Sequence, residues 1–363
     1  MLNLIKKLKE VKEFRKNKGK RHPLWLILLI IILGTMQGYL GYRALGGFAK
    51  SNVKEICETF GIVTFRVPSF SCIRRVTLGV DWENLLEIFN QWAAEEYKDI
   101  LDILWLALDG KSLRNTVINA NDAEQNFVKI VSMFSQETGL VLHLKQIENK
   151  TGSEIAAVQD TIRDCQLENK IFTGDSLQCQ RETIKAIVET NNNYVIAVKK
   201  NQPNLYNHLE KISENEPRIG YYLEQDNSHG RKITREVSVF EFTDNTKKEW
   251  DSVESVIKVN RSGDRGKKPY EEVAYYISNC RKDAETFCQK IRGHWGIENI
   301  LHWVRDVIFK EDDSPIKDFK AATNMSILLT IGMNLLRSSG FLSITDGQRW
   351  LDRKWNRLMI LLA

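Results

Sequence analysis

The sequence predicts an α/β protein in which a mixed β-sheet is flanked by helices and preceded by a helical domain. Three observations lead to this fold class. Apolar residues recur at helical spacing from Leu2 to about Tyr97. Apolar strand segments then alternate with helical segments as far as Lys199, which is typical of a sheet covered by helices. Strand signals return between His229 and Ser278 and indicate a β-rich insertion.

The helical N-terminal domain is expected to span residues 1–98 and to bind DNA. Residues 6–21 carry nine Lys and Arg side chains against Glu10 and Glu13. Such a segment is typical of an arm that contacts DNA phosphates, or of a solvated helix face. A later helix, capped by Ser69 or Ser71, would display Arg74 and Arg75 either to a DNA groove or simply to solvent.

Residues 24–33 are apolar throughout and follow basic residues, so a membrane anchor competes with a buried helix. A spanning helix needs roughly 20 apolar residues. Gly34, Gln37 and Arg43 interrupt the extension of this run. We therefore expect a helix buried in the protein, and no membrane partner.

The sheet is expected to begin with a strand at residues 103–108, which are apolar without a break. Strands near 128–135 and 140–147 follow, joined by a short loop that contains Gly139 and has the length of a hairpin connection. The order then continues as a helix at 153–167, a strand at 170–173, a helix at 178–190 and a strand at 194–199. This order predicts an antiparallel meander at one side of the sheet and parallel crossovers at the other.

The β-rich insertion is expected to span about residues 218–280. Its strands are predicted at 233–242, 256–259 and 273–277, with a polar turn at 261–268. Helical spacing resumes at Asp283, and a further helix is predicted at 321–337.

Two carboxylates follow predicted strands of the sheet. Asp109 comes directly after the unbroken apolar strand, although an Asp-Gly pair can also do no more than open a turn. Asp175 closes the crossover strand in the same manner. If the two strands are parallel neighbours, both acids face one pocket and their repulsion favours a divalent cation, Mg²⁺ or Mn²⁺.

A third carboxylate, Glu298, lies on the predicted helix after the insertion. Taken alone it could be an ordinary exposed glutamate, and four acidic neighbours compete for the role of third ligand: Asp306, Glu311, Asp312 and Asp313. Three converging acids would hold two metal ions for an in-line phosphoryl displacement. A phosphate-binding loop for ATP is excluded, because Trp105 stands where that motif requires a glycine.

Three long segments carry a resemblance. ALDGKSLRN, FTGDSLQCQRETIKAIVETNNNYVIAVKKNQPNL, and IRGHWGIENILHWVRDVIFKEDDS followed by NMSILLTIGMNLLR are similar to the signature blocks of the H-repeat-associated, DDE-type insertion-sequence transposases of bacteria. RHPLWLILLIIILGTMQGY and HGRKITR extend the resemblance over nearly the whole chain. It implies a ribonuclease-H-like catalytic domain at residues 99–363, with Asp109, Asp175 and Glu298 as the catalytic, metal-binding triad. It also implies Mg²⁺-dependent DNA cleavage and strand transfer at the inverted repeats of an insertion sequence, with two ions bound and Mn²⁺ as a substitute.

The resemblance also implies DNA contacts. Related transposases carry an Arg before the glutamate and a Lys after it, and this chain has His294 and Arg305 at those places. Lys111, Lys199 and Lys200 follow strand ends, where they would meet the DNA backbone or remain solvated.

Aromatic residues surround Glu298 in the sequence. Trp295, His302 and Trp303 could stack on an unpaired base, although Trp at helical spacing more often belongs to a core.

Composition agrees with these expectations without deciding them. The net charge of +5 permits a double-stranded DNA partner. The six cysteines form no C-x-x-C pair, and a reducing cytoplasm fits them best. As a DNA-binding protein, the chain is expected in the cytoplasm, at the nucleoid. By analogy with the family we expect a homodimer in the DNA complex. Two alternatives stay open from sequence: a metal-dependent nuclease that does not join ends, and a DNA-binding derivative that has lost catalysis.

Overall fold

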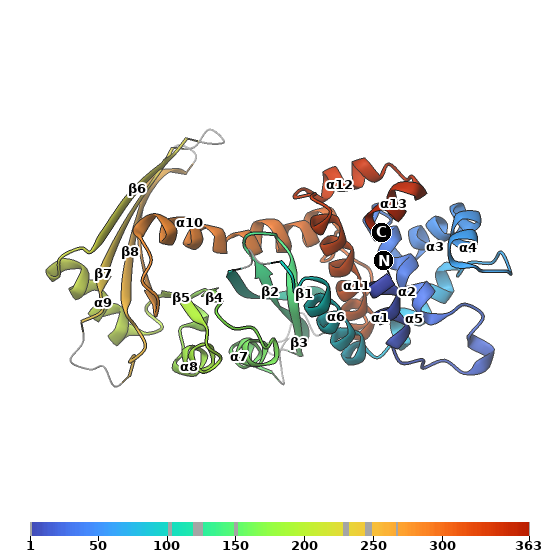
Figure 1. Cartoon of the computed structure of the whole chain (residues 1–363), viewed down its shortest axis with the longest axis horizontal. Coiled ribbons are helices and arrows are strands. Elements are labelled where there is room, and N and C mark those ends of the chain that lie inside the picture. Colours follow the sequence, from blue (N-terminus) through green and yellow to red (C-terminus); the bar gives the residue numbers. More distant parts are fainter. Residues whose placement is uncertain are drawn as a thin grey trace.

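The computed structural model describes residues 2–100, 104–118, 126–148, 152–227, 232–243, 249–265 and 268–362. Its centre is a nine-stranded mixed sheet in the order β3-β2-β1-β4-β5-β9-β8-β7-β6. Figure 1 shows the molecule as elongated, with β6 to β9 at one end, the helices of both termini at the other, and β1 to β5 between them. The predicted mixed α/β sheet is confirmed.

The first five strands form the predicted meander and crossovers. β1 (Trp105–Ile118), β2 (Asn126–Ser135) and β3 (Val141–Glu148) are antiparallel neighbours. β4 (Ile171–Gly174) and β5 (Asn193–Val198) run parallel to β1. The crossovers contain α7 (Glu154–Asp164) and α8 (Arg181–Glu189), whose apolar sides join the core on one face of the sheet. Residue 103, the predicted start of the first strand, lies outside the described residues.

The insertion extends the same sheet. After α9 (Pro203–Asn215) come β6 (Gly220–Asp226), β7 (Ile233–Glu241), β8 (Ser255–Arg265) and β9 (Lys268–Ser278), and β9 pairs antiparallel with β5. β6 and α9 were not predicted. The predicted polar turn is partly wrong, because residues 261–265 belong to β8, where cross-strand pairing with β9 prevails over polar composition. Residues 229 and 266–267 lie outside the described part.

Helices from both ends of the chain form one lobe. The N-terminal helices are α1 (Leu2–Glu10), α2 (Leu24–Met36), α3 (Gly41–Ser51), α4 (Val53–Phe60), α5 (Phe70–Gly79) and α6 (Trp82–Glu96). The C-terminal helices are α11 (Phe319–Ser338), α12 (Ile344–Leu351) and α13 (Trp355–Leu362). Both groups share one hydrophobic core with side chains of β1 to β3. The division of the chain after residue 98 stays a prediction.

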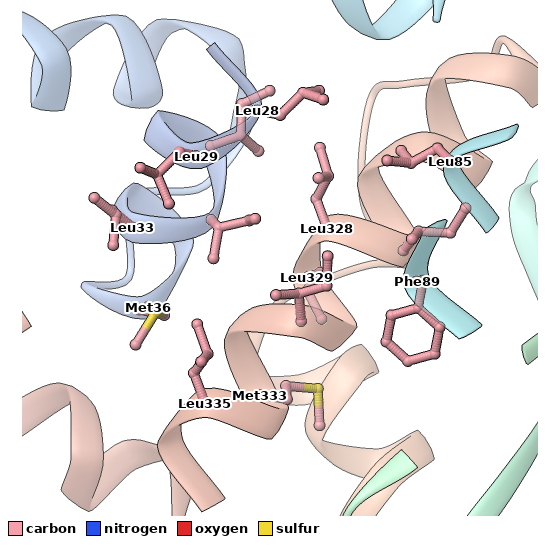
Figure 2. Packing of buried hydrophobic residues seen from close by; sticks show 14 of the residues in the cluster. Leu28, Leu29, Leu33, Met36, Leu85, Phe89, Leu328, Leu329, Met333 and Leu335 are labelled. Carbon is pink, nitrogen blue, oxygen red and sulfur yellow. The ribbon is translucent and has the colours of Figure 1, made fainter. Parts of the chain in front are cut away.

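The apolar helix α2 lies inside this lobe. Every residue of it except Trp25 is buried. Figure 2 shows α2, with Leu28 and Met36 labelled, beside the part of α11 that carries Leu328 and Leu335. In the described part of the chain, residues 17–36 alone are long and apolar enough to cross a membrane, and 72% of their most apolar 18-residue window is buried inside the protein. The expected buried helix is confirmed.

Residues 62–67 form an irregular connection between α4 and α5. The side chain of Val63 is 91% exposed and no strand partner lies in the described residues. The capping prediction beside this segment is confirmed, since Ser69 Oγ accepts a hydrogen bond from Cys72 N at the start of α5.

Two asparagines from different helices cover the outer edge of β3. Asn90 of α6 accepts from Leu144 N at 2.9 Å and donates to Leu144 O at 3.0 Å. Asn334 of α11 makes the same pair of bonds with Val141, at 3.0 and 2.7 Å. Each amide thus replaces a missing strand partner, which satisfies the backbone and blocks further pairing at this edge.

Candidate active site

Asp109 lies within β1 and not at its end, so that part of the prediction was wrong. β1 pairs with its parallel neighbour β4 only from Trp105 to Ala107, whereas its antiparallel pairing with β2 continues through Asp109 to Leu113. The strand therefore persists on one side and has an open edge on the other. Asp109 lines a cavity of about 560 Å³ there.

Asp175 is aligned with Asp109 by the register of the sheet. Ala107 pairs with Thr173, and each aspartate stands two residues beyond its member of this pair. Asp175 also caps the short 3₁₀ helix η2 (Ser176–Gln178), because its Oδ1 accepts from Leu177 N at 2.9 Å. Both carboxylates line the same cavity, as the sequence predicted.

Glu298 reaches this cavity from a helical segment that crosses above the sheet. α10 (Ala284–His294) begins at the capping residue Asp283 and continues into the π-helical turns η4 (Ile297–His302) and η5 (Val304–Ile308). Figure 1 shows this segment running from β6–β9 toward α11. Arg337 of α11 donates to Ile300 O and to Gly139 O, which fastens η4 to the β2–β3 hairpin.

One cluster in the described residues has the composition of a metal site. Ligand atoms of Asp109, Glu298 and His302 all lie within 4.8 Å of one another. His302 Nδ1 is 3.4 Å from Asp109 Oδ2 and 3.5 Å from Glu298 Oε2. Asp175 stands in the same cavity but outside this cluster.

The electrostatics of the cluster favour a cation. Burial, followed by the charge of Glu298, raises the pKa of Asp109 to about 8, and Asp175 adds to the repulsion. The nearby imidazole of His302 lowers the pKa of Glu298, and Asp109 contributes in the same direction. Two ionised carboxylates this close repel each other, and a divalent cation between them would relieve that repulsion. These oxygen donors fit such an ion.

His294 supports the site without bringing a positive charge. Its Nδ1 lies 2.9 Å from Thr173 Oγ1, and that hydroxyl also accepts from Gln136 Nε2 at 3.0 Å. Burial lowers the pKa of His294 to about 4, so the ring is neutral at neutral pH. It can offer a phosphate a hydrogen bond only.

Lys111 and Arg305, both expected to contact DNA, are buried in ion pairs. Lys111 is 6% exposed and lies 2.6 Å from Asp306 and 3.2 Å from Asp312. Arg305 is fully buried and donates twice to Glu311 at 2.8 Å. Their positions do not support a contact with DNA. These ion pairs also engage three of the four acids that were alternatives to Glu298 as the third metal ligand, namely Asp306, Glu311 and Asp312.

The remaining predicted residues are exposed. Lys199 and Lys200 line the cavity beside the carboxylates, whereas Arg74 and Arg75 lie on α5 in the helical lobe.

The tryptophans beside Glu298 are also exposed. Trp295 and Trp303 each have 52% of their surface exposed, so the expectation that they belong to the core was wrong. His302 is instead buried in the metal cluster, which the sequence did not indicate.

The β-rich insertion also lines the cavity, which sequence analysis did not predict. Arg261 of β8 lines the cavity and donates to Tyr276 Oη of β9 at 3.0 Å. The residue was predicted to start a solvent-exposed turn, and nothing in its local sequence indicates that β9 pairs with β5 and so brings it beside Asp109.

Two known protein families match this chain, one over its helical N-terminal part and one over the part that carries the candidate site. The transposase DDE domain family matches residues 102–335, which include Asp109, Asp175 and Glu298. The chain belongs to the DDE transposase family. A second family, described as DDE_Tnp_1-associated, matches residues 5–93 of the helical lobe.

Named relatives support the same family. The “H repeat-associated putative transposase YhhI” of Escherichia coli strain K12 is 29% identical over 348 residues, covering 92% of this chain and 90% of the relative. The “Putative transposase YncI” of Escherichia coli O157:H7 is 29% identical over 351 residues, covering 92% of this chain and 87% of the relative. The predicted membership among H-repeat-associated transposases is therefore confirmed, and a DDE domain implies the use of divalent metal.

Proposed function

We propose that this chain is the transposase of an insertion sequence, which binds the element's inverted repeats, cuts the DNA at its ends and joins those ends to target DNA. One observation carries the proposal: Asp109 of β1, Asp175 directly after β4 and Glu298 of η4 line one cavity. We assign the triad to two Mg²⁺ ions, for which Mn²⁺ can substitute, in a ribonuclease-H-like arrangement of β1 to β5. The site of action is the nucleoid in the cytoplasm.

The residues of the cavity have separable roles in this proposal. The bound cations would supply electrostatic stabilisation for an in-line displacement, in which an attacking oxygen bonds to phosphorus as the bond to the leaving oxygen breaks. Asp109, Asp175 and Glu298 hold that charge in place. Lys199 and Lys200, at the edge of the cavity, bind the phosphate backbone, and His294 donates a hydrogen bond to it.

A joining assay tests the proposal. Labelled element ends are incubated with a target plasmid and Mg²⁺, and the products are separated on a gel. Wild-type protein should yield ends joined to plasmid, whereas Asp175→Asn and Glu298→Gln should yield neither cut nor joined DNA. Asparagine at position 175 can still cap η2, so its defect would not arise from lost folding. Asp160→Asn and Glu285→Gln, carboxylates outside the cavity, are the matched controls.

The possible outcomes separate the alternatives. Cut ends without joined product would indicate a nuclease, and binding of the inverted repeats without any cutting would indicate a catalytically inactive derivative. Undiminished cutting by both variants would refute the triad.

The helical lobe is proposed to bind the inverted repeats through Arg74 and Arg75, which are exposed on α5. Replacing both by Ala should weaken binding and lower the slope of log K against log salt by about 2, because each contact with a phosphate displaces about one counterion. Lys185→Ala, on the distant helix α8, should leave the slope unchanged. Sedimentation of the DNA complex should give the mass of two protein chains, as expected for a homodimer that holds two ends.

A further inference from the structure

His302 stands out among the buried polar groups of the described residues. Its side chain is 7% exposed, and its only polar contacts are made through Nδ1 to Asp109 and Glu298. Its other nitrogen, Nε2, is buried and has no hydrogen-bond partner within the described part of the chain. The ring is therefore directed by these two carboxylates and not by a separate hydrogen-bond network.

The two distances do not suit hydrogen bonds. An N–H···O bond spans about 2.7–3.2 Å between heavy atoms, and a single N–H cannot point at two different carboxylates with good geometry. Nδ1 lies 3.4 and 3.5 Å from the two oxygens. Two ligands of one cation, in contrast, lie about 3.0–3.5 Å apart when each bond is about 2.0–2.2 Å long. The two distances from Nδ1 thus match the separation of ligands that share one ion.

The local helix geometry accounts for the arrangement. His302 follows Glu298 by four residues within the π-helix η4, whose wider turn brings these two side chains to the same side. Arg337 donates to Ile300 O within the same turn and so holds the irregular backbone in place. The π-helix therefore brings an imidazole and a carboxylate from one turn against Asp109 of β1.

We propose that His302 is a ligand of the cation held between Asp109 and Glu298, and that this imidazole makes the site prefer Mn²⁺ to Mg²⁺. Mg²⁺ takes oxygen ligands almost exclusively, whereas the later divalent ions accept an imidazole nitrogen. Asp175, whose Oδ1 is used by the backbone of η2, remains outside this ligand set and would serve a second ion. The inference rests on the proposed function, because it assumes that the carboxylates bind a catalytic cation.

Electron spin-echo spectroscopy of Mn²⁺ bound to the full-length protein tests the proposal without measuring activity. A directly bound imidazole should give nitrogen modulation of the Mn²⁺ echo, and that modulation should change when the protein's histidines are labelled with ¹⁵N. This arm of the experiment needs no variant and is independent of any effect on folding.

Two histidine variants complete the test. His302→Gln should remove the modulation, weaken Mn²⁺ binding at least about 10-fold and lower the ratio of Mn²⁺ to Mg²⁺ affinity by a similar factor. His294→Gln, at the same distance in sequence on the other side of Glu298 but bonded to Thr173, should keep the modulation.

Each outcome is decisive. Mn²⁺ that binds without nitrogen modulation overturns the role of His302 and leaves the carboxylate site and the proposed function intact. Failure of the wild-type protein to bind Mn²⁺ would overturn both. Nitrogen modulation that persists in His302→Gln but is lost in His294→Gln would transfer the ligand role to the other histidine and refute the inference.

Discussion

Lys111 Nζ lies 2.6 Å from Asp306 Oδ1, and this ion pair, whose lysine is buried, joins β1 to η5. The same ammonium contacts Asp312 at 3.2 Å. Since Lys111 is two residues from Asp109 and Asp306 is eight residues from Glu298, the pair holds together the two elements that carry these acids. Lys111, which was expected to contact DNA, therefore stabilises the fold.

Lys111→Met should lower the free energy of unfolding by about 3–5 kcal/mol, because it leaves partly buried carboxylates without their cation. Arg114→Met is the matched control: Arg114 contacts the same Asp312 at 3.6 Å, but its side chain is 82% exposed. Its loss should cost less than about 1 kcal/mol. Urea unfolding of both variants measures the difference, and equal losses would contradict a structural role for Lys111.

Asn334→Ala should destabilise the protein by about 2–3 kcal/mol, because it leaves the N–H and C=O groups of Val141 unpaired in a buried position. Asn215→Ala removes a comparable side-chain bond, to Lys211 O, at an exposed helix end and should cost little. Thermal unfolding would show the contrast. A similar small change in both variants would mean that water satisfies the edge of β3.

His143 should give the protein a steep loss of stability in acid. Burial lowers the pKa of His143 from 6.5 to about 4, and its Nε2 lies 3.3 Å from Asn90 Nδ2. Since the pKa is lower in the folded state, the stabilisation is complete above pH 6.5 and is lost as the pH falls toward 4. The loss amounts to about 2–3 kcal/mol. His143→Gln cannot titrate, so unfolding measured from pH 7 to 4.5 should decline less than in the wild type. If the stability of both proteins fell equally with pH, His143 would not be the group responsible.

Asp109→Asn should stabilise the metal-free protein while abolishing its response to cations. The pKa of Asp109 is raised from 3.8 to about 8, so the stability that its protonated form provides is lost as the pH rises through 8. At pH 8 and without cations, the variant should exceed the wild type by about 1–3 kcal/mol, with the gap closing toward pH 4. Mg²⁺ or Mn²⁺ should raise the Tm of the wild type only. A variant that is less stable at every pH would contradict this reading.

Local sequence was sufficient for the elements that are buried or strongly periodic. The unbroken apolar runs of β1 and α2 and the alternation of strands with α7 and α8 gave the correct order, because burial prevails at those positions. Asp109 and Asp175 could be placed together because the parallel register that aligns them follows from the crossover, whereas Glu298 was singled out only by the resemblance to the transposase family.

Features that depend on distant partners were missed. β1 continues past Asp109 only because β2 pairs with it. Arg305 can be buried only because its guanidinium donates hydrogen bonds to Glu311 and Ser326. His302 is buried at the end of the π-helical turn η4, and Trp295 and Trp303 are exposed on either side of that turn. No local composition specifies such a turn.

The β5–β9 pairing has a mechanical consequence. Because hydrogen bonds continue from β3 to β6 without a break, the insertion cannot swing against the strands that carry Asp109 and Asp175 unless that ladder is broken. In the proposed transposase, a reorientation between cutting a strand and joining it would therefore not come from a swing of the insertion.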